Sequence, residues 1–132
     1  MNIGAVAKAT GITAKTIRYY ESIGLTPRPD RRDNGYRDYG PNDVATLKFV
    51  QRARGLGFPL EEVRALLTLW RDDSRASADV KRLALDHVDA IEARIAELEA
   101  MKRTLHDLTR RCHGDDRPDC PILDDLAKAG QG

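Results

Sequence analysis

The sequence predicts an all-α fold with a small β wing, in which a winged helix-turn-helix head precedes one long helix. Three observations predict it. Two short helical segments near the start are separated by a glycine-containing turn. Asn34-Gly35, the strongest short hairpin signal, follows them. A charged segment from Ser77 to about Arg111 then repeats apolar residues every three or four positions.

The first 24 residues carry the helix-turn-helix pattern. Ile3 to Ala9 is predicted as a helix, and Thr13 is expected to cap a second one from Ala14 to Ile23, ended by Gly24. The predicted inward face of the second helix contains Ile17, Tyr20 and Ile23. The opposite face contains Lys15, Arg18, Tyr19 and Ser22. That face suits a groove lined with phosphates and base edges, although an ordinary solvated face explains it equally well.

A basic segment follows from Pro27 to Gly40. Its prolines and glycines exclude a long helix, and Asn34-Gly35 predicts a hairpin turn. The turn is surrounded by Arg28, Arg31, Arg32 and Arg37, with Tyr36 and Tyr39 interleaved. A basic hairpin directly after a helix-turn-helix is typical of a wing that lies along a sugar-phosphate backbone.

The charge distribution agrees with a polyanionic partner for the front of the chain. Residues 1–58 hold ten Lys and Arg against five Asp and Glu, whereas residues 59–132 hold twelve against sixteen. A basic front and an acidic rear favour nucleic acid as the partner of the front.

Two further helices complete the predicted head, residues 1–70. One starts at Pro41, which fits the first helical turn, and ends at Gly55-Leu56-Gly57. The other runs from Leu60 to Trp70, and Pro59 stands where a capping side chain would be expected.

The long helix, residues 77–111, carries an apolar stripe on an otherwise charged rod. The stripe consists of Ala84, Val88, Ile91, Ile95, Leu98 and Leu105. Such a rod cannot fold alone, and no second helix of comparable length exists in the chain. We therefore expect a homodimer with an antiparallel or parallel seam.

The last predicted region, residues 112–132, is a loop and tail that contains both cysteines. Gly114 and Pro118 lie between Cys112 and Cys120 and allow the sulfurs to meet. Two thiolates suit Cu(I), whereas zinc would need His113, an aspartate or the other subunit as further ligands. A reversible disulfide and a pair of inert thiols are the competing interpretations. We expect His113 to be an exposed loop residue rather than a ligand.

Several function classes are not supported. No stretch approaches the roughly 20 apolar residues that span a membrane, and the N-terminus does not look like a secretory signal. Two cysteines are too few for the disulfide framework of a small secreted protein, so we expect a location in the reducing cytoplasm. No catalytic constellation indicates an enzyme. The alternative from a different class is a copper chaperone or a thiol oxidoreductase. A thiol oxidoreductase would be expected to show a Cys-x-x-Cys motif in a βαβ context, which is absent.

With these elements in order, the chain resembles the MerR family of transcription regulators, and within it the CueR-type copper-efflux regulators. The matching segments of the head are Ile3-Gly4-Ala5-Val6-Ala7, Thr16-Ile17-Arg18-Tyr19-Tyr20-Glu21, Gly24-Leu25, Asn34-Gly35-Tyr36-Arg37 and Gly57-Phe58. Those of the rear are Ser77-Ala78-Asp79-Val80-Lys81 and Cys112 to Cys120. Divalent-metal sensors of the family carry a third cysteine where this chain has Ser77.

The resemblance implies a long antiparallel dimerisation helix and a dimer that acts with RNA polymerase on double-stranded promoter DNA. Metal binding would convert the dimer from repressor to activator by distorting the promoter, so that copper efflux or detoxification genes are expressed. Cu(I) would bind Cys112 and Cys120, and Ag(I) or Au(I) would bind likewise. Ser77 and Lys81 would lie near the ion, at the start of the partner's helix. The alternative is a divalent-metal (Zn or Cd) or thiol-redox regulator. The expected DNA contacts are Lys15, Thr16, Arg18, Tyr19, Tyr20, Arg31, Arg32, Tyr36, Arg37 and Arg54.

Overall fold

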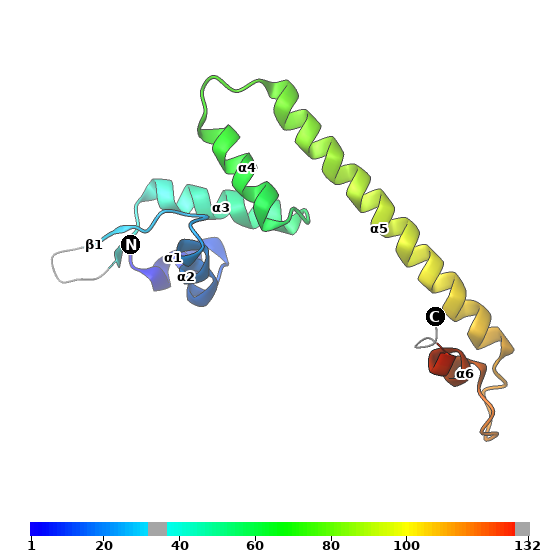
Figure 1. Ribbon diagram of the computed structural model, residues 1–132. Coiled ribbons are helices and arrows are strands. Elements are labelled where there is room, and N and C mark those ends of the chain that lie inside the picture. Colours follow the sequence, from blue (N-terminus) through cyan, green and yellow to red (C-terminus); the bar gives the residue numbers. More distant parts are fainter. Residues whose placement is uncertain (32–36, 129–132) are drawn as a thin grey trace. The chain divides into compact units, whose positions relative to one another are not determined.

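The computed structural model describes residues 1–31 and 37–128, and these are mostly helical (Figure 1). Their contacts divide the chain into two units, Met1–Ala84 and Leu85–Gly132. No helix of the described residues is both long and apolar enough to cross a bilayer.

The helix-turn-helix pattern of the first unit is confirmed. Helix α1 (Ile3–Thr10) begins where the Asn2 side chain accepts the Ala5 N–H at 2.8 Å, and it ends at Gly11, whose φ is 75°. Helix α2 (Ala14–Ser22) begins where the Thr13 hydroxyl oxygen accepts the Thr16 N–H at 3.2 Å. Both caps satisfy N–H groups that have no partner inside the helix.

The predicted wing falls only in part on the described residues. Strand β1 (Asp30–Arg31) pairs antiparallel with strand β2 (Arg37–Asp38), with Asp30 opposite Asp38. Residues 32–36, which contain the Asn34-Gly35 turn, lie outside the described residues. The helical part of the predicted fold class is therefore confirmed, and the wing stays a prediction.

Two longer helices complete the head. Helix α3 (Pro41–Gly55) begins with Pro41, and the Asp43 carboxylate accepts the Gly40 N–H at 2.8 Å. Helix α4 (Leu60–Arg71) begins after Pro59 without a side-chain cap and runs one residue beyond the predicted end. Both starts agree with the sequence analysis.

The core of the first unit is formed where these four helices meet. Its buried members are Val6, Ile12, Ile17, Tyr20, Leu25, Tyr39, Leu47, Val50, Ala53, Phe58, Val63 and Leu67. Among them, Tyr39 donates its hydroxyl proton to the buried Glu21 carboxylate at 2.7 Å. A carboxylate out of water needs such a donor, so this bond fixes the end of the wing segment to α2.

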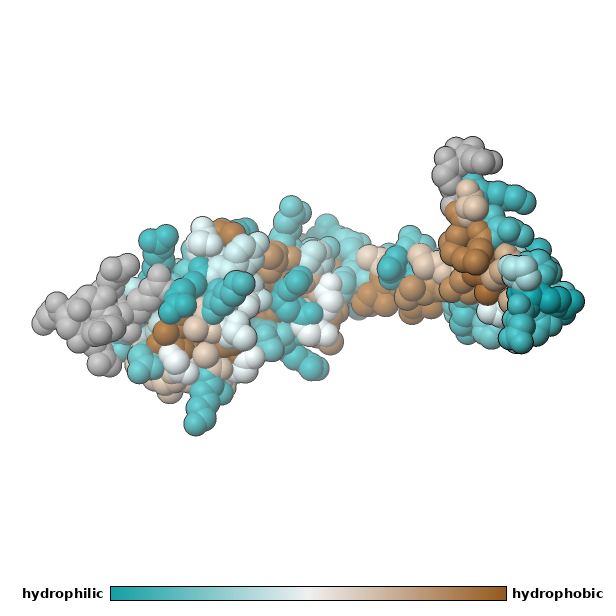
Figure 2. Space-filling view, turned by 90° about the horizontal axis from the view of Figure 1, so that it is seen from below, coloured by the Kyte–Doolittle hydropathy of each residue, from teal (hydrophilic) through white to brown (hydrophobic). Residues whose placement is uncertain are grey.

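Helix α5 (Ser77–Arg111) has the predicted bounds and continues through the second unit. Its apolar stripe is open to solvent: Ile91 is 40% exposed and Leu98 is 49% exposed. Figure 2 shows hydrophobic (brown) surface along this helix. Within the described residues, the stripe residues from Val88 to Leu98 remain exposed, which is the arrangement that a dimer seam requires.

The second unit also contains a helix that the sequence analysis missed. The predicted loop and tail, residues 112–132, in fact include α6 (Pro121–Lys128). Pro121 in the first helical position and the spacing of Ile122 and Leu126 signal this helix. Apolar residues of α5 and α6 line a groove together, among them Met101, Leu105, Leu108, Ile122 and Leu126.

Candidate DNA interface and cysteine loop

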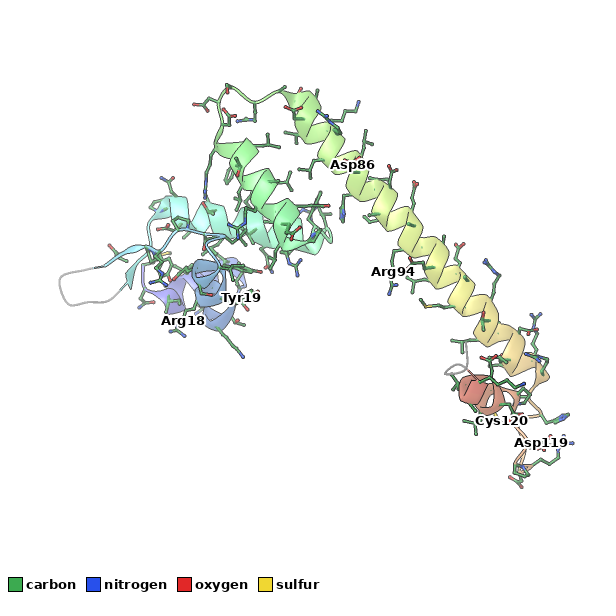
Figure 3. All side chains as sticks on the ribbon, in the orientation of Figure 1. Arg18, Tyr19, Asp86, Arg94, Asp119 and Cys120 are labelled. Atoms are coloured by element: carbon green, nitrogen blue, oxygen red, sulfur yellow. The ribbon has the colours of Figure 1, made fainter. Side chains whose placement is uncertain are left out.

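The outer face of α2 presents the predicted combination of charge and aromatic surface. Lys15 and Arg18 are exposed, and Tyr19 is 51% exposed. Figure 3 labels Arg18 and Tyr19 on this helix. Thr16 is half-buried, and its hydroxyl accepts a hydrogen bond from Thr13 at 3.0 Å. Two cations and a phenol on one rigid helix can meet phosphates and base edges together.

Tyr20 does not belong to this face, so its prediction as a DNA contact is corrected. Its side chain is only 7% exposed and packs in the core with Ile17. The helical period explains the correction, because residues three apart share a face and Ile17 is fully buried. Its neighbour Tyr19 points outward, with the two ring centroids 6.2 Å apart.

The other predicted DNA contacts are less completely described. Arg54 is exposed at the end of α3, and one of its N–H groups donates to the Phe58 carbonyl at 2.9 Å. The structure does not describe the side chains of Arg31, Arg32, Tyr36 and Arg37.

A side chain that the sequence analysis missed holds the end of α2. Arg64, on α4, donates to the carbonyls of Ile23 at 2.9 Å and Gly24 at 3.0 Å. The partners are 41 and 40 residues apart in sequence, so no local pattern could reveal the contact.

The two cysteines lie at the two ends of one loop in the second unit. Cys112 follows α5, and its N–H donates to the Leu108 carbonyl at 3.1 Å. Cys120 precedes α6, and its carbonyl accepts the Asp124 N–H at 3.0 Å (Figure 3). Both thiols are half-buried and neither forms a disulfide. Gly114, with φ of 67°, turns the chain between them.

An ion pair inside this loop engages one of its carboxylates. Arg117 donates through Nε to Asp115 at 2.8 Å, and its backbone N–H donates to the same carboxylate at 3.0 Å. These bonds lower the pKa of Asp115 below its ordinary value, with the Arg117 side chain as the largest cause. Asp115 is therefore paired with Arg117 within the loop.

The donor set of the loop fits a soft ion of low coordination number. Within residues 1–31 and 37–128, no group of three or more His, Cys, Asp or Glu side chains is arranged to hold a metal ion. Two thiols on one loop are a sufficient ligand set for Cu(I), whereas a tetrahedral zinc site needs more donors. His113 is exposed beside Cys112.

Ser77 and Lys81 lie in the first two turns of α5, and both are exposed. They belong to the first unit, whereas the cysteines belong to the second. Asp79, between them in sequence, forms an exposed ion pair with Arg82 at 2.6 Å.

The sequence of the chain is similar to those of known proteins over nearly all of its length. Residues 1–69 match the family model of the MerR HTH family regulatory proteins, and residues 44–108 match the model described as MerR, DNA binding. Heavy metal-dependent transcription regulator 2 of Rhizobium meliloti (strain 1021) is 55% identical, over 96% of this chain and 86% of its own length. The HTH-type transcriptional regulator CueR of Escherichia coli O157:H7 is 47% identical, over 96% of this chain and 94% of its own.

The fold has a close counterpart among solved structures. The transcription regulator PbrR691 from Ralstonia metallidurans CH34, in complex with lead(II), superposes with a TM-score of 0.83 at 33% identity, covering 96% of this chain and 98% of that one. Proteins of this family are DNA-binding transcription regulators and not enzymes. The helix-turn-helix head, the long α5 and the two family matches agree, and the chain belongs to the MerR family.

Proposed function

We propose that this regulator binds promoter DNA as a homodimer and is switched by Cu(I), or by Ag(I) and Au(I), held between Cys112 and Cys120. The observation that carries the proposal is the pair of half-buried, unbonded thiols at the two ends of one loop. The relatives named as heavy-metal and CueR regulators support a metal signal for this loop.

The outer face of α2 is the proposed reading surface, and the wing and the end of α3 add phosphate contacts. The proposed contacts are Lys15, Thr16, Arg18 and Tyr19 on α2, Arg54 on α3, and Arg31, Arg32, Tyr36 and Arg37 at the wing. The exposure of Lys15, Arg18 and Tyr19 supports their part in this set.

The apolar stripe of α5 is the proposed dimer seam, with the partner's helix antiparallel. An exposed row of Val88, Ile91, Ile95 and Leu98 is costly in water and is covered when two such helices pair. A homodimer also matches a palindromic operator, because each head meets one half-site.

Charge favours a monovalent ion at the loop. One Cu(I) with two thiolates carries a net charge of about −1, whereas a divalent ion with the same ligands is neutral. Cys120 stands at the N-terminus of α6, whose partial positive charge favours an anion. Ser77 of the partner subunit supplies no thiolate, and Lys81 of the partner subunit adds a positive charge beside the site.

Metal binding would change the shape of the promoter DNA while the dimer stays bound to it. Cys112 and Cys120 would hold the ion and so fix the loop, and the dimer would then bend and untwist the DNA so that RNA polymerase can engage its elements. The regulated genes would export or detoxify copper. Unbonded thiols fit a reducing cytoplasm as the site of action.

A divalent-metal regulator is the second candidate. It is favoured by the lead(II) complex of PbrR691 and by the exposed His113, which could add a ligand beside Cys112. A third candidate, a thiol-redox switch, would use a disulfide between the two cysteines, which are free in this structure.

Native mass spectrometry of the dimer tests the proposed ion. We expect one Cu(I) or Ag(I) to be retained per chain, because each loop supplies one pair of thiolates. Zn(II) at the same buffered free concentration should not be retained. Equal retention of Zn(II), or no retained Cu(I), would contradict the proposal.

A further inference from the structure

Arg64 connects two helices that lie far apart in sequence. It lies on α4, and its Nη2 and Nη1 groups donate to the carbonyls of Ile23 and Gly24, directly after α2, at 2.9 and 3.0 Å. A guanidinium presents its donors in a planar fork, so it can engage two adjacent carbonyls at once. The positive charge also meets the negative end of the α2 dipole.

The neighbouring carbonyls of α2 are satisfied by the chain itself. The N–H groups of Ile23, Gly24 and Leu25 donate to the carbonyls of Tyr19, Glu21 and Tyr20 at 3.1, 3.1 and 2.9 Å. Gly24 adopts φ of 72°, which a residue with a side chain rarely does. The turn therefore closes on its own, and Arg64 ties the closed turn to α4.

We propose that Arg64 is a positioning residue for DNA recognition, which fixes the direction of α2 by clamping its C-terminal turn. The proposal rests on the proposed role of α2 in reading DNA. A nine-residue helix is about 13 Å long, so a tilt of about 5° moves one end by about 1 Å. A shift of that size is enough to lose a hydrogen bond to a base edge.

Arg64→Met removes the donors and keeps an unbranched apolar side chain. We expect it to weaken binding about tenfold to a duplex that the wild-type protein selects from a random-sequence pool. Affinity for an unrelated duplex should change less than twofold, because nonspecific binding does not need the exact direction of α2. Arg64→Lys should recover part of the loss, since an ammonium can donate to a carbonyl but does not present a planar fork.

Arg75 provides a matched control. It donates to the carbonyls of Trp70 and Asp72, both at 3.1 Å, so it also places a guanidinium on two carbonyls at a helix end, but at α4 rather than α2. Arg75→Met removes the same charge and the same kind of bond. We expect its affinity for the selected duplex to stay within twofold of wild type.

The dependence on salt separates positioning from direct contact. Arg18→Ala removes a proposed phosphate contact and should reduce the slope of log affinity against log salt by about one unit. Arg64→Met should leave that slope unchanged and should speed amide exchange at Leu25. Unchanged affinity in Arg64→Met, or a slope reduced as in Arg18→Ala, overturns the proposal. If Arg18→Ala has no effect on affinity or slope while Arg64→Met does, the reading role of α2 is wrong instead.

Discussion

Cys112→Ser and Cys120→Ser are each expected to abolish activation by Cu(I) and Ag(I) while operator affinity stays within about twofold of wild type. A serine oxygen is a poor ligand for a soft ion, and one remaining thiolate cannot hold it. The proposed DNA-binding face belongs to the first unit and the cysteines to the second, so we expect the substitutions to leave that face intact. Transcription in vitro and gel shifts on the same promoter measure the two effects.

Asp119→Asn is the matched control for the cysteine variants. Asp119 is an exposed loop residue next to Cys120 (Figure 3), and its replacement alters the loop without removing a thiol. We expect activation by Cu(I) to stay within about threefold of wild type. Full activation by either serine variant would show that the signal does not depend on a two-thiolate site.

The double variant Ile91→Asp, Leu98→Asp is expected to abolish both the dimer and operator binding. A charge left buried and unpaired in the seam costs about 3–5 kcal/mol, and each substitution places one there in both subunits. A single head then meets only one half-site, so operator affinity should fall by more than a hundredfold. Sedimentation and gel shifts measure the two losses.

Two alanines away from the stripe provide the control for this variant. Ala90 and Ala93 are exposed on the same helix, and Ala90→Asp, Ala93→Asp adds the same charge outside the stripe. We expect this protein to remain a dimer with near-normal operator affinity. A folded dimer of the Ile91→Asp, Leu98→Asp protein would place the seam elsewhere.

Elements with local signals were predictable from the sequence. Thr13 caps α2 as predicted, because a capping hydroxyl binds a backbone N–H only three residues further along the chain. Helix α5 has the predicted bounds, because its apolar repeat is set by residues three and four positions apart. Helix α6 has a readable signal in Pro121 and the spacing of its apolar residues, although a loop and tail are predicted there.

The candidate site shows where such prediction ends. The sequence places Tyr20 on the predicted inward face and the family resemblance places it among the DNA contacts, and its burial in the structure decides for the inward face. The clamp of Arg64 on Ile23 and Gly24 joins residues about 40 positions apart, so it depends on where the tertiary fold places α4 relative to the turn after α2. The ion choice depends on ligands and charges that two cysteines alone do not specify.

Transcription in vitro with Cu(I), Ag(I) and Zn(II) at buffered free concentrations, for the wild-type protein and for His113→Ala, tests the monovalent assignment most directly. We expect activation by Cu(I) and Ag(I) in both proteins, because His113 is proposed not to be a ligand, and no activation by Zn(II). Activation of the wild type by Zn(II), lost in His113→Ala, would contradict it and establish a divalent site that includes His113.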